Sequence, residues 1–100
     1  MTAYRFTIEA GHACLDGHFP GAPIVPGVVI LEHVGRAVAR AYGGRVTRIL
    51  RCKFVAGLEP EQACGITLEP DGERRLRFGC MGPDGEIAHG SIEWSPSDDG

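Results

Sequence analysis

The chain carries one histidine and one carboxylate whose surroundings suit proton transfer. His18 lies in the glycine- and proline-rich segment 17–27, which restricts the backbone and so fixes the direction of the imidazole. Glu32 follows within an apolar run. Because an unpaired carboxylate is costly to bury, a glutamate beside a positioned imidazole is typical of a general acid–base pair. The pattern therefore predicts an enzyme.

Both residues also have a purely structural interpretation. A loop histidine such as His18 can be satisfied by its own backbone, and Glu32 can pair with Arg36 four residues further along a helix. A guanidinium at this position would favour the ionised form of Glu32. That form suits a water-holding or electrostatic role better than direct proton donation, so the role of the acid stays open.

A single helix is expected to position Glu32. Pro26 fits the first helical position, and Gly43-Gly44 is a stop signal, so the helix runs from about 27 to 42. Its first turns are apolar all round, and small residues follow them. We therefore expect this helix to lie buried and surrounded by other elements.

The remaining segments alternate apolar and polar residues and read as strands and turns. A strand at about 4–8 is followed by a long loop over 10–25, and long ordered loops in small domains are usually functional. After the helix, the expected strands cover 46–55, 63–68, 74–81 and 87–94. Their spacing predicts a four-strand antiparallel meander.

The most economical packing of these elements curls the sheet around the helix. We predict the α+β architecture called the hotdog fold, with a curled antiparallel sheet of about five strands wrapped around one central helix. Residues 1–94 would form one domain, and 95–100 a flexible acidic tail. An open edge strand is a liability that two copies commonly remove by joining edges.

The distribution of charged residues along the chain indicates the kind of partner that the protein binds. The net charge is −3, yet residues 33–58 hold six of the ten basic residues and no acid. This basic band favours an acidic or phosphate-bearing partner over general nucleic-acid binding. It also fits a solvated helix end plus one outward strand face.

The cysteines and the first residues of the chain indicate the cellular compartment. Cys14, Cys52, Cys64 and Cys80 form no metal-binding spacing and are typical of core residues in a reducing cytoplasm. The first residues do not read as a secretory signal, and no apolar stretch is long enough to cross a membrane. The sequence therefore predicts a cytoplasmic protein without a metal or other cofactor.

One motif resembles a known family. The run His18-Phe19-Pro20-Gly21-x-Pro23-x-x-Pro26-Gly27-x-x-x-x-Glu32 is similar to the active-site signature of beta-hydroxyacyl-acyl carrier protein dehydratases. The pair Lys53-Phe54, followed by Pro60, is similar to the strand after the central helix in that family. The short length looks most like the small dehydratases of aryl-polyene and polyketide-type pathways. That family often has Gln where this chain has Arg36.

The resemblance implies a dimer whose site lies between subunits. His18 of one chain would remove the alpha proton of a 3-hydroxyacyl thioester, and Glu32 of the other would protonate the departing hydroxyl. The N–H of Gly27 would act as the oxyanion donor. The resemblance further implies acyl carrier protein as the partner and either a homodimer or a heterodimer with a related subunit.

Further residues are candidates for substrate and carrier contacts. Phe19, Val28 and Leu31 are candidates for an acyl tunnel, although each also fits ordinary core. Pro26 adjoins the site, and Arg36 is a candidate contact for the phosphopantetheine arm. Basic side chains that suit docking of an acidic carrier are Arg48, Arg51 and Lys53.

Two other functions fit the same fold. In a thioesterase, Glu32 would activate water against the thioester carbonyl. In a carrier-binding subunit of a hetero-oligomeric dehydratase, the chain would not itself be catalytic. The sequence favours dehydration of a 3-hydroxyacyl thioester to the trans-2-enoyl product, in fatty acid or polyene-type synthesis, and leaves the acyl group undefined.

Overall fold

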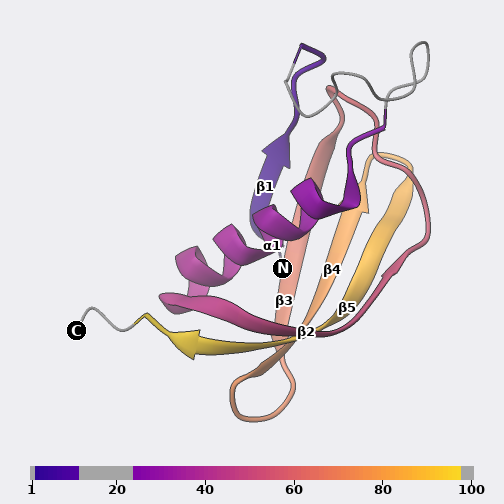
Figure 1. The fold of residues 1–100 in the computed structure, drawn as a ribbon. Helices are drawn as coiled ribbons and strands as arrows, with labels where there is room; N and C mark the ends of the chain where they lie inside the picture. The colour runs from indigo at the N-terminus through magenta and orange to yellow at the C-terminus, as the bar shows by residue number, and fades with distance from the viewer. Residues whose placement is uncertain (1, 12–23, 98–100) are drawn as a thin grey trace.

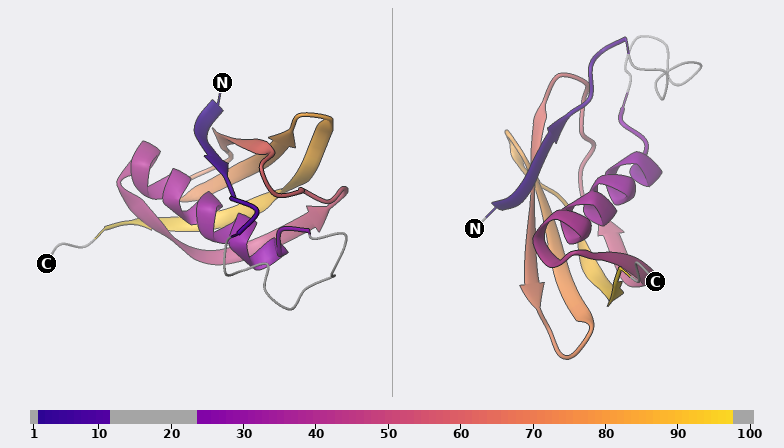
Figure 2. Two further views of the ribbon diagram at one scale, coloured as in Figure 1. Left: turned by 90° about the horizontal axis from the view of Figure 1, so that it is seen from above. Right: turned by 90° about the vertical axis from the view of Figure 1, so that its left-hand side faces the viewer.

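The sheet and its helix form two layers. The computed structural model describes residues 2–11 and 24–97. In chain order the elements are β1 (Thr2–Thr7), α1 (Gly27–Tyr42), β2 (Gly44–Phe54), β3 (Ala63–Pro70), β4 (Arg75–Gly82) and β5 (Gly85–Pro96). Figure 1 shows α1 lying across one face of the curved sheet, and both views in Figure 2 agree. This is the hotdog architecture that the sequence predicts.

The order of the strands differs from the predicted meander. All pairings are antiparallel, and the order is β1-β3-β4-β5-β2. Only β3, β4 and β5 are joined as successive hairpins, so the prediction of a four-strand meander is wrong. β2 instead crosses to the far side and pairs with β5. As a result, β1 and β2 are the two edges of the sheet.

One face of α1 supplies the helical part of the core. Ile30, Val34, Ala37 and Val38 are at most 2% exposed and pack against apolar residues of the sheet. The opposite face is open, because Val28 is 66% exposed and Glu32 and Arg36 are exposed as well. The expectation of a helix buried all round is therefore wrong for the single chain. The helix covers the sheet, but no described element covers the helix.

The helix ends where the sequence indicates. Gly43 adopts a left-handed conformation (φ 67°) that side chains disfavour, and its N–H donates to the carbonyl of Ala39. The chain reverses at once into β2, so Tyr42 packs against Trp94 of β5, with ring centroids 5.2 Å apart. The C-terminal end of α1 is thereby fixed over the β2–β5 pair.

The last strand is longer than predicted. β5 reaches Pro96, and the Ser97 N–H donates to the Gly43 carbonyl at 3.0 Å. Ser95 and Pro96 thus belong to the sheet rather than to a tail, and residues 98–100 lie outside the described part of the chain. Within residues 2–11 and 24–97, no helix has both the length and the hydrophobicity to span a bilayer.

The contrast between the two faces of α1 gives a stability prediction. Ile30→Ala should lower the free energy of unfolding by about 2–5 kcal/mol, because it opens a cavity in the core. Val28→Ala, a similar truncation two residues away on the open face, should change it by less than about 0.5 kcal/mol. Urea denaturation at low protein concentration measures both. Equal losses in the two variants would contradict the packing described above.

Candidate active site

The start of α1 lies against the end of β2. The Val25 N–H donates to the Leu58 carbonyl at 2.8 Å, which ties the segment before the helix to the β2–β3 connection. The N–H groups of Val55 and Ala56 both donate to the Ile87 carbonyl, at 2.8 and 3.3 Å. These bonds hold residues 54–58 beside the first turn of the helix.

Gly27 lies directly against the side chain of Phe54. A Cβ atom at this position would lie 2.7 Å from the tip of the Phe54 ring, closer than real Cβ contacts. Glycine therefore lets the ring pack directly against the first turn of α1. No other residue type fits here without displacing that ring.

Among the described residues, no side chain bonds to the first N–H groups of α1. The first turn of the helix also contains no acidic residue. The earliest described bond to the helix is from the Val29 N–H to the Pro26 carbonyl at 3.0 Å, so the N–H of Gly27 precedes the intrahelical ladder. Together with the helix dipole, such N–H groups favour a negatively charged oxygen.

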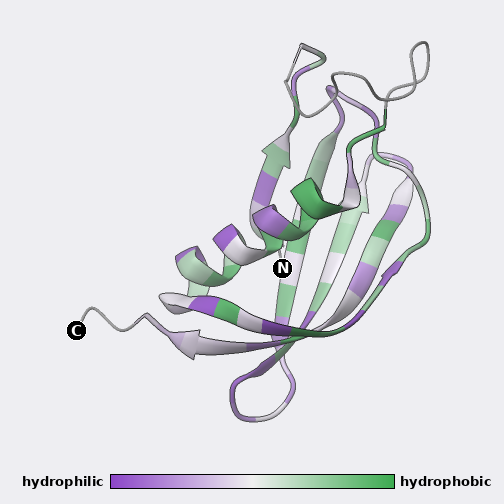
Figure 3. Cartoon of the chain, in the orientation of Figure 1, coloured by the Kyte–Doolittle hydropathy of each residue, from purple (hydrophilic) through white to green (hydrophobic). Residues whose placement is uncertain are grey.

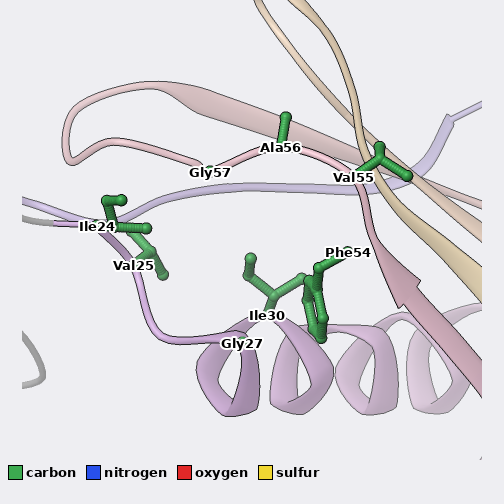
Figure 4. Close-up of a pocket in the computed structure, with 8 residues that line it drawn as sticks. All are labelled: Ile24, Val25, Gly27, Ile30, Phe54, Val55, Ala56 and Gly57. Carbon is green, nitrogen blue, oxygen red and sulfur yellow. The ribbon is translucent and has the colours of Figure 1, made fainter.

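A pocket of about 540 Å³ opens beside this helix start. Its lining comes from the segment before α1, the first turns of α1 and the segment after β2, as Figure 4 shows. The lining residues are Ile24, Val25, Gly27, Ile30, Phe54, Val55, Ala56 and Gly57. All are apolar or glycine, and Figure 3 shows the same apolar character at the first turn of α1. The pocket suits an aliphatic or aromatic group whose polar end meets the backbone at Gly27.

Glu32 lies on the open face of α1. The spacing of four residues places Val28, Glu32 and Arg36 on one exposed stripe of the helix. The described residues show no salt bridge between Glu32 and Arg36, so the predicted pairing is not formed in the single chain. The expected burial of Glu32 is also not found, because the helix turns this stripe away from the core.

The neighbouring histidine has a different environment. His33 stacks on Phe6 of β1, with ring centroids 3.9 Å apart and planes within 3°. The Tyr4 hydroxyl lies 3.2 Å from Nδ1 of His33, within hydrogen-bond distance. His33 therefore points toward β1 and away from the Glu32 stripe, as adjacent helical positions require.

The other predicted site residues are distributed around the helix start. Pro26 precedes the first helical residue and is half-buried, and Leu31 packs against the core. Neither Leu31 nor Val28 lines the pocket, whereas Ile30 does. His18 and Phe19 lie outside the described residues. The pairing of His18 with Glu32 therefore stays a prediction.

Sequence reasoning missed most of the pocket lining. Ile24, Ile30 and the segment 54–57 are separated along the chain and converge only through the strand order. Phe54 did carry a signal, because the pair Lys53-Phe54 follows the helix in the resembled family. The alternation of β2 places Phe54 on the same side of the sheet as α1, which the contact with Gly27 bears out.

The predicted carrier-docking residues lie on the outer face of the sheet, meaning the face away from α1. Cross-strand partners share a face. Arg48 pairs with Glu93, Arg51 with Ser91 and Lys53 with His89 of β5, whereas Phe54 pairs with the buried Ala88. Arg36 and Arg40, by contrast, are exposed on α1. The basic band of the sequence is thus divided between two surfaces.

The described cysteines are core or half-buried residues. Cys64 and Cys80 are fully buried, Cys52 is partly buried, and all three are free thiols. A hydrogen bond with Cys64, and then burial, raise the pKa of Cys80. Burial also raises the pKa of Cys52. Cys14 lies outside the described residues. Within the described ranges, no three His, Cys, Asp or Glu residues gather where they could hold a metal ion.

The sequence matches one protein family over most of its length. The model of the ApeI-like family, described as ApeI dehydratase, matches residues 1–91. The hotdog architecture and the open helix start next to an apolar pocket agree with that assignment. The chain therefore belongs to the ApeI-like dehydratase family.

Curated relatives carry a dehydratase name. The chain is 52% identical over 57 residues to the 3-hydroxyacyl-acyl-carrier-protein dehydratase FabZ of Haemophilus influenzae strain PittEE, covering 52% of this chain and 36% of that protein. It is 45% identical over 53 residues to the FabZ of Klebsiella pneumoniae strain MGH 78578, covering 53% of this chain and 29% of that protein. The chain thus spans about a third of the length of the curated relatives that it matches.

Solved structures share the fold. The dehydratase heterocomplex ApeI:P from Xenorhabdus doucetiae superposes with a TM-score of 0.76 at 24% identity, covering 90% of this chain and 82% of that chain. A protein from Erwinia carotovora subsp. atroseptica superposes with a TM-score of 0.75, also at 24% identity, covering 92% of this chain and 80% of that chain. At these identities the likeness shows the architecture.

The contact between Gly27 and Phe54 gives a catalytic prediction. Gly27→Ala should lower kcat/KM in a dehydratase assay by about 10- to 100-fold, because the added Cβ displaces the helix start or the Phe54 ring from its position in the pocket. The matched control is Gly35→Ala in the same helix, where a Cβ meets no atom within 4 Å. The control should retain activity and gain about 0.5–1 kcal/mol of stability. Equal activity in both variants would contradict a role for the helix start.

Proposed function

We propose that this chain dehydrates a 3-hydroxyacyl thioester, carried on acyl carrier protein, to the trans-2-enoyl thioester. The observation that carries the proposal is the helix start at Gly27, which no described side chain caps, beside an apolar pocket in a chain of the ApeI-like dehydratase family. Elimination next to a thioester builds negative charge on the carbonyl oxygen. A preorganised N–H donor stabilises that charge in the transition state.

The proposed reaction uses one base and one acid. The imidazole of His18 takes the proton from C2, and the electron pair forms the C2–C3 double bond. The C3–O bond breaks, and Glu32 gives a proton to the leaving hydroxyl, directly or through water. The thioester oxygen stays on the Gly27 N–H, and the acyl chain occupies the pocket lined by Ile30 and Phe54. The step releases one water and needs no redox partner.

We propose that a second subunit completes the site, so that His18 of one chain faces Glu32 of the other. Three observations on the described residues support this. Glu32 is exposed in the single chain, β2 is an open edge strand, and large apolar side chains stay uncovered near that edge. These are Val28 (66% exposed), Ile49 (47%) and Phe54 (45%). In the assembly Phe19, Val28 and Leu31 would extend the apolar path for the acyl chain.

The second subunit is either another copy or a related chain. The structural neighbour from Xenorhabdus doucetiae is a dehydratase heterocomplex. The acyl group would belong to fatty acid or polyene-type synthesis in the cytoplasm, where the free thiols of Cys64 and Cys80 remain reduced.

Carrier docking is proposed at the cationic side chains of β2. Arg48, Arg51 and Lys53 are exposed and suit an acidic protein surface. Lys53 adjoins Phe54, whose ring lies in the pocket wall, so β2 links the outer face to the pocket. Arg36, exposed on α1, is the proposed contact for the phosphopantetheine arm.

Removing the base and the acid tests the reaction. His18→Ala should abolish enoyl formation and Glu32→Gln should lower kcat by about 10²-fold or more, because each removes one proton-transfer group. The controls His89→Ala and Glu73→Gln alter exposed or partly exposed groups away from the pocket and should retain turnover. The assay follows enoyl product and free thiol together, with unfolding curves for each variant.

The same assay separates the competing functions. Enoyl product without thiol supports dehydration, thiol release would indicate a thioesterase, and neither product would indicate a binding subunit. Full turnover in folded His18→Ala would remove His18 from the mechanism.

Neutralising two cations tests carrier docking. Arg48→Gln/Arg51→Gln should raise the KM for acyl carrier substrate several-fold at low salt and leave kcat unchanged, because the lost attraction acts on encounter with the carrier. The difference should shrink as salt rises. Arg5→Gln/Arg40→Gln removes the same charge on the β1 side of the molecule and serves as the control. If both pairs change KM equally, the effect is one of net charge and not of this docking surface.

A further inference from the structure

Both ends of α1 are attached toward the same edge of the sheet. At its start, Gly27 lies against Phe54 of β2, and at its end Tyr42 packs on Trp94 of β5, with ring centroids 5.2 Å apart. β5 and β2 are the last two strands in the order of the sheet, whereas β1 is the strand at the opposite edge. These two attachments alone would let the helix roll about its long axis, toward or away from β1.

The buried face of the helix restricts that roll only weakly. Its core side chains are all apolar, and burial of apolar surface has no preferred direction, so a small rotation changes it little. These side chains are Ile30, Val34, Ala37 and Val38. A contact that depends on direction is therefore the one that defines the rotation of α1.

His33 makes such a contact with β1. Its ring stacks on Phe6, with centroids 3.9 Å apart and planes within 3°, and its Nδ1 lies 3.2 Å from the Tyr4 hydroxyl. Phe6 is buried and Tyr4 packs against the core, so the sheet holds both partners. Because a hydrogen bond depends on distance and angle, the pair Tyr4–His33 fixes how far α1 is turned toward β1.

The rotation of α1 determines where Glu32 points. Glu32 precedes His33, and successive residues of a helix lie about 100° apart around its axis. An angle that is fixed for His33 is therefore fixed for Glu32. Glu32 is exposed and forms no salt bridge in the described part of the chain, so the backbone of the helix aims its carboxylate.

We propose that Tyr4 and His33 are positioning residues for the acid of the reaction, because their contact sets the rotation of α1 and so aims the Glu32 carboxylate at the leaving hydroxyl. This inference rests on the proposed function and adds two residues that do not touch the substrate. The Gly27 N–H and the apolar pocket lie toward the other edge of the sheet. Loss of the Tyr4–His33 contact therefore affects proton delivery and spares substrate binding.

Four variants separate the hydrogen bond from the bulk of the side chains. Tyr4→Phe removes the hydroxyl and keeps the ring, whereas His33→Phe keeps a ring on Phe6 and removes Nδ1. His33→Asn is the rescue variant, because its amide retains a hydrogen-bonding atom near the place of Nδ1. The control Tyr42→Phe removes a hydroxyl at the end of the same helix and keeps the ring that packs on Trp94.

Two substrates separate proton delivery from a general loss of structure. One is a 3-hydroxyacyl-pantetheine thioester, and the other is its 3-fluoro analogue. In the analogue the base takes the C2 proton, the C2–C3 double bond forms, and the C3–F bond breaks as its electron pair leaves with fluoride. Fluoride departs without a proton, so its elimination depends far less on an acid at Glu32. Enoyl formation gives kcat and KM for both substrates.

Tyr4→Phe and His33→Phe should each lower kcat for the hydroxy substrate by about tenfold or more, because a small misplacement of a reacting group is costly. Their KM values, and their kcat for the fluoro substrate, should stay within about twofold of wild type. The double variant should be no slower than either single variant, because both remove the same bond. His33→Asn and Tyr42→Phe should keep at least about half of the wild-type kcat on both substrates.

Equal losses on the two substrates, or full turnover of the hydroxy substrate in folded Tyr4→Phe, would overturn the inference. Unfolding curves establish that each variant is folded. Glu32→Gln is the reference, because it should slow the hydroxy substrate and spare the fluoro substrate. If Glu32→Gln does so and Tyr4→Phe does not, this inference alone fails. If Glu32→Gln turns over the hydroxy substrate at the wild-type rate, the acid of the proposed function fails, and this inference fails with it.

Discussion

The close contact between the start of α1 and the end of β2 is the constraint on which the rest of the site depends. Gly27 lets the Phe54 ring lie against the first helical turn, and the bond from Val25 to Leu58 holds the two segments together. The ring and the helix start both line the apolar pocket, and no described side chain caps the N–H groups at this end of the helix. A negatively charged oxygen and an apolar chain, the two parts of an acyl thioester undergoing elimination, can both be accommodated there.

In the single chain, the proposed acid Glu32 lies at the surface. The carboxylate of Glu32 lies on the uncovered face of α1, and the exposed apolar side chains cluster near the same helix start and the open β2 edge. An exposed apolar surface next to an unpaired strand is costly to leave in water. Under the proposed function, the subunit that covers this edge is also the one that brings a base to Glu32.

Much of this arrangement follows from local sequence signals, and the rest does not. Pro26 and Gly43 define the helix at 27–42 because their backbone preferences act locally. The segment Gly57-Leu58-Glu59-Pro60 is typical of a turn, which favoured a meander. The pairing of β2 with β5 instead depends on contacts between residues far apart in the chain. The apolar first turn suggested a fully buried helix, yet Val28 faces outward. Gly27 and Phe54 belong to the two sequence motifs that resemble the dehydratase family, whereas Ile30 becomes a pocket residue only through the packing of the elements.

The most direct test of the central claim is the amide resonance of Gly27 during binding of a stalled substrate. A 3-hydroxyacyl-pantetheine analogue with an amide in place of the thioester keeps the carbonyl oxygen but resists elimination. If that oxygen accepts a hydrogen bond from the helix start, the Gly27 N–H signal should move strongly downfield on binding, together with the ring signals of Phe54. Saturable binding that leaves Gly27 unmoved, with shifts confined to other parts of the chain, would contradict the account.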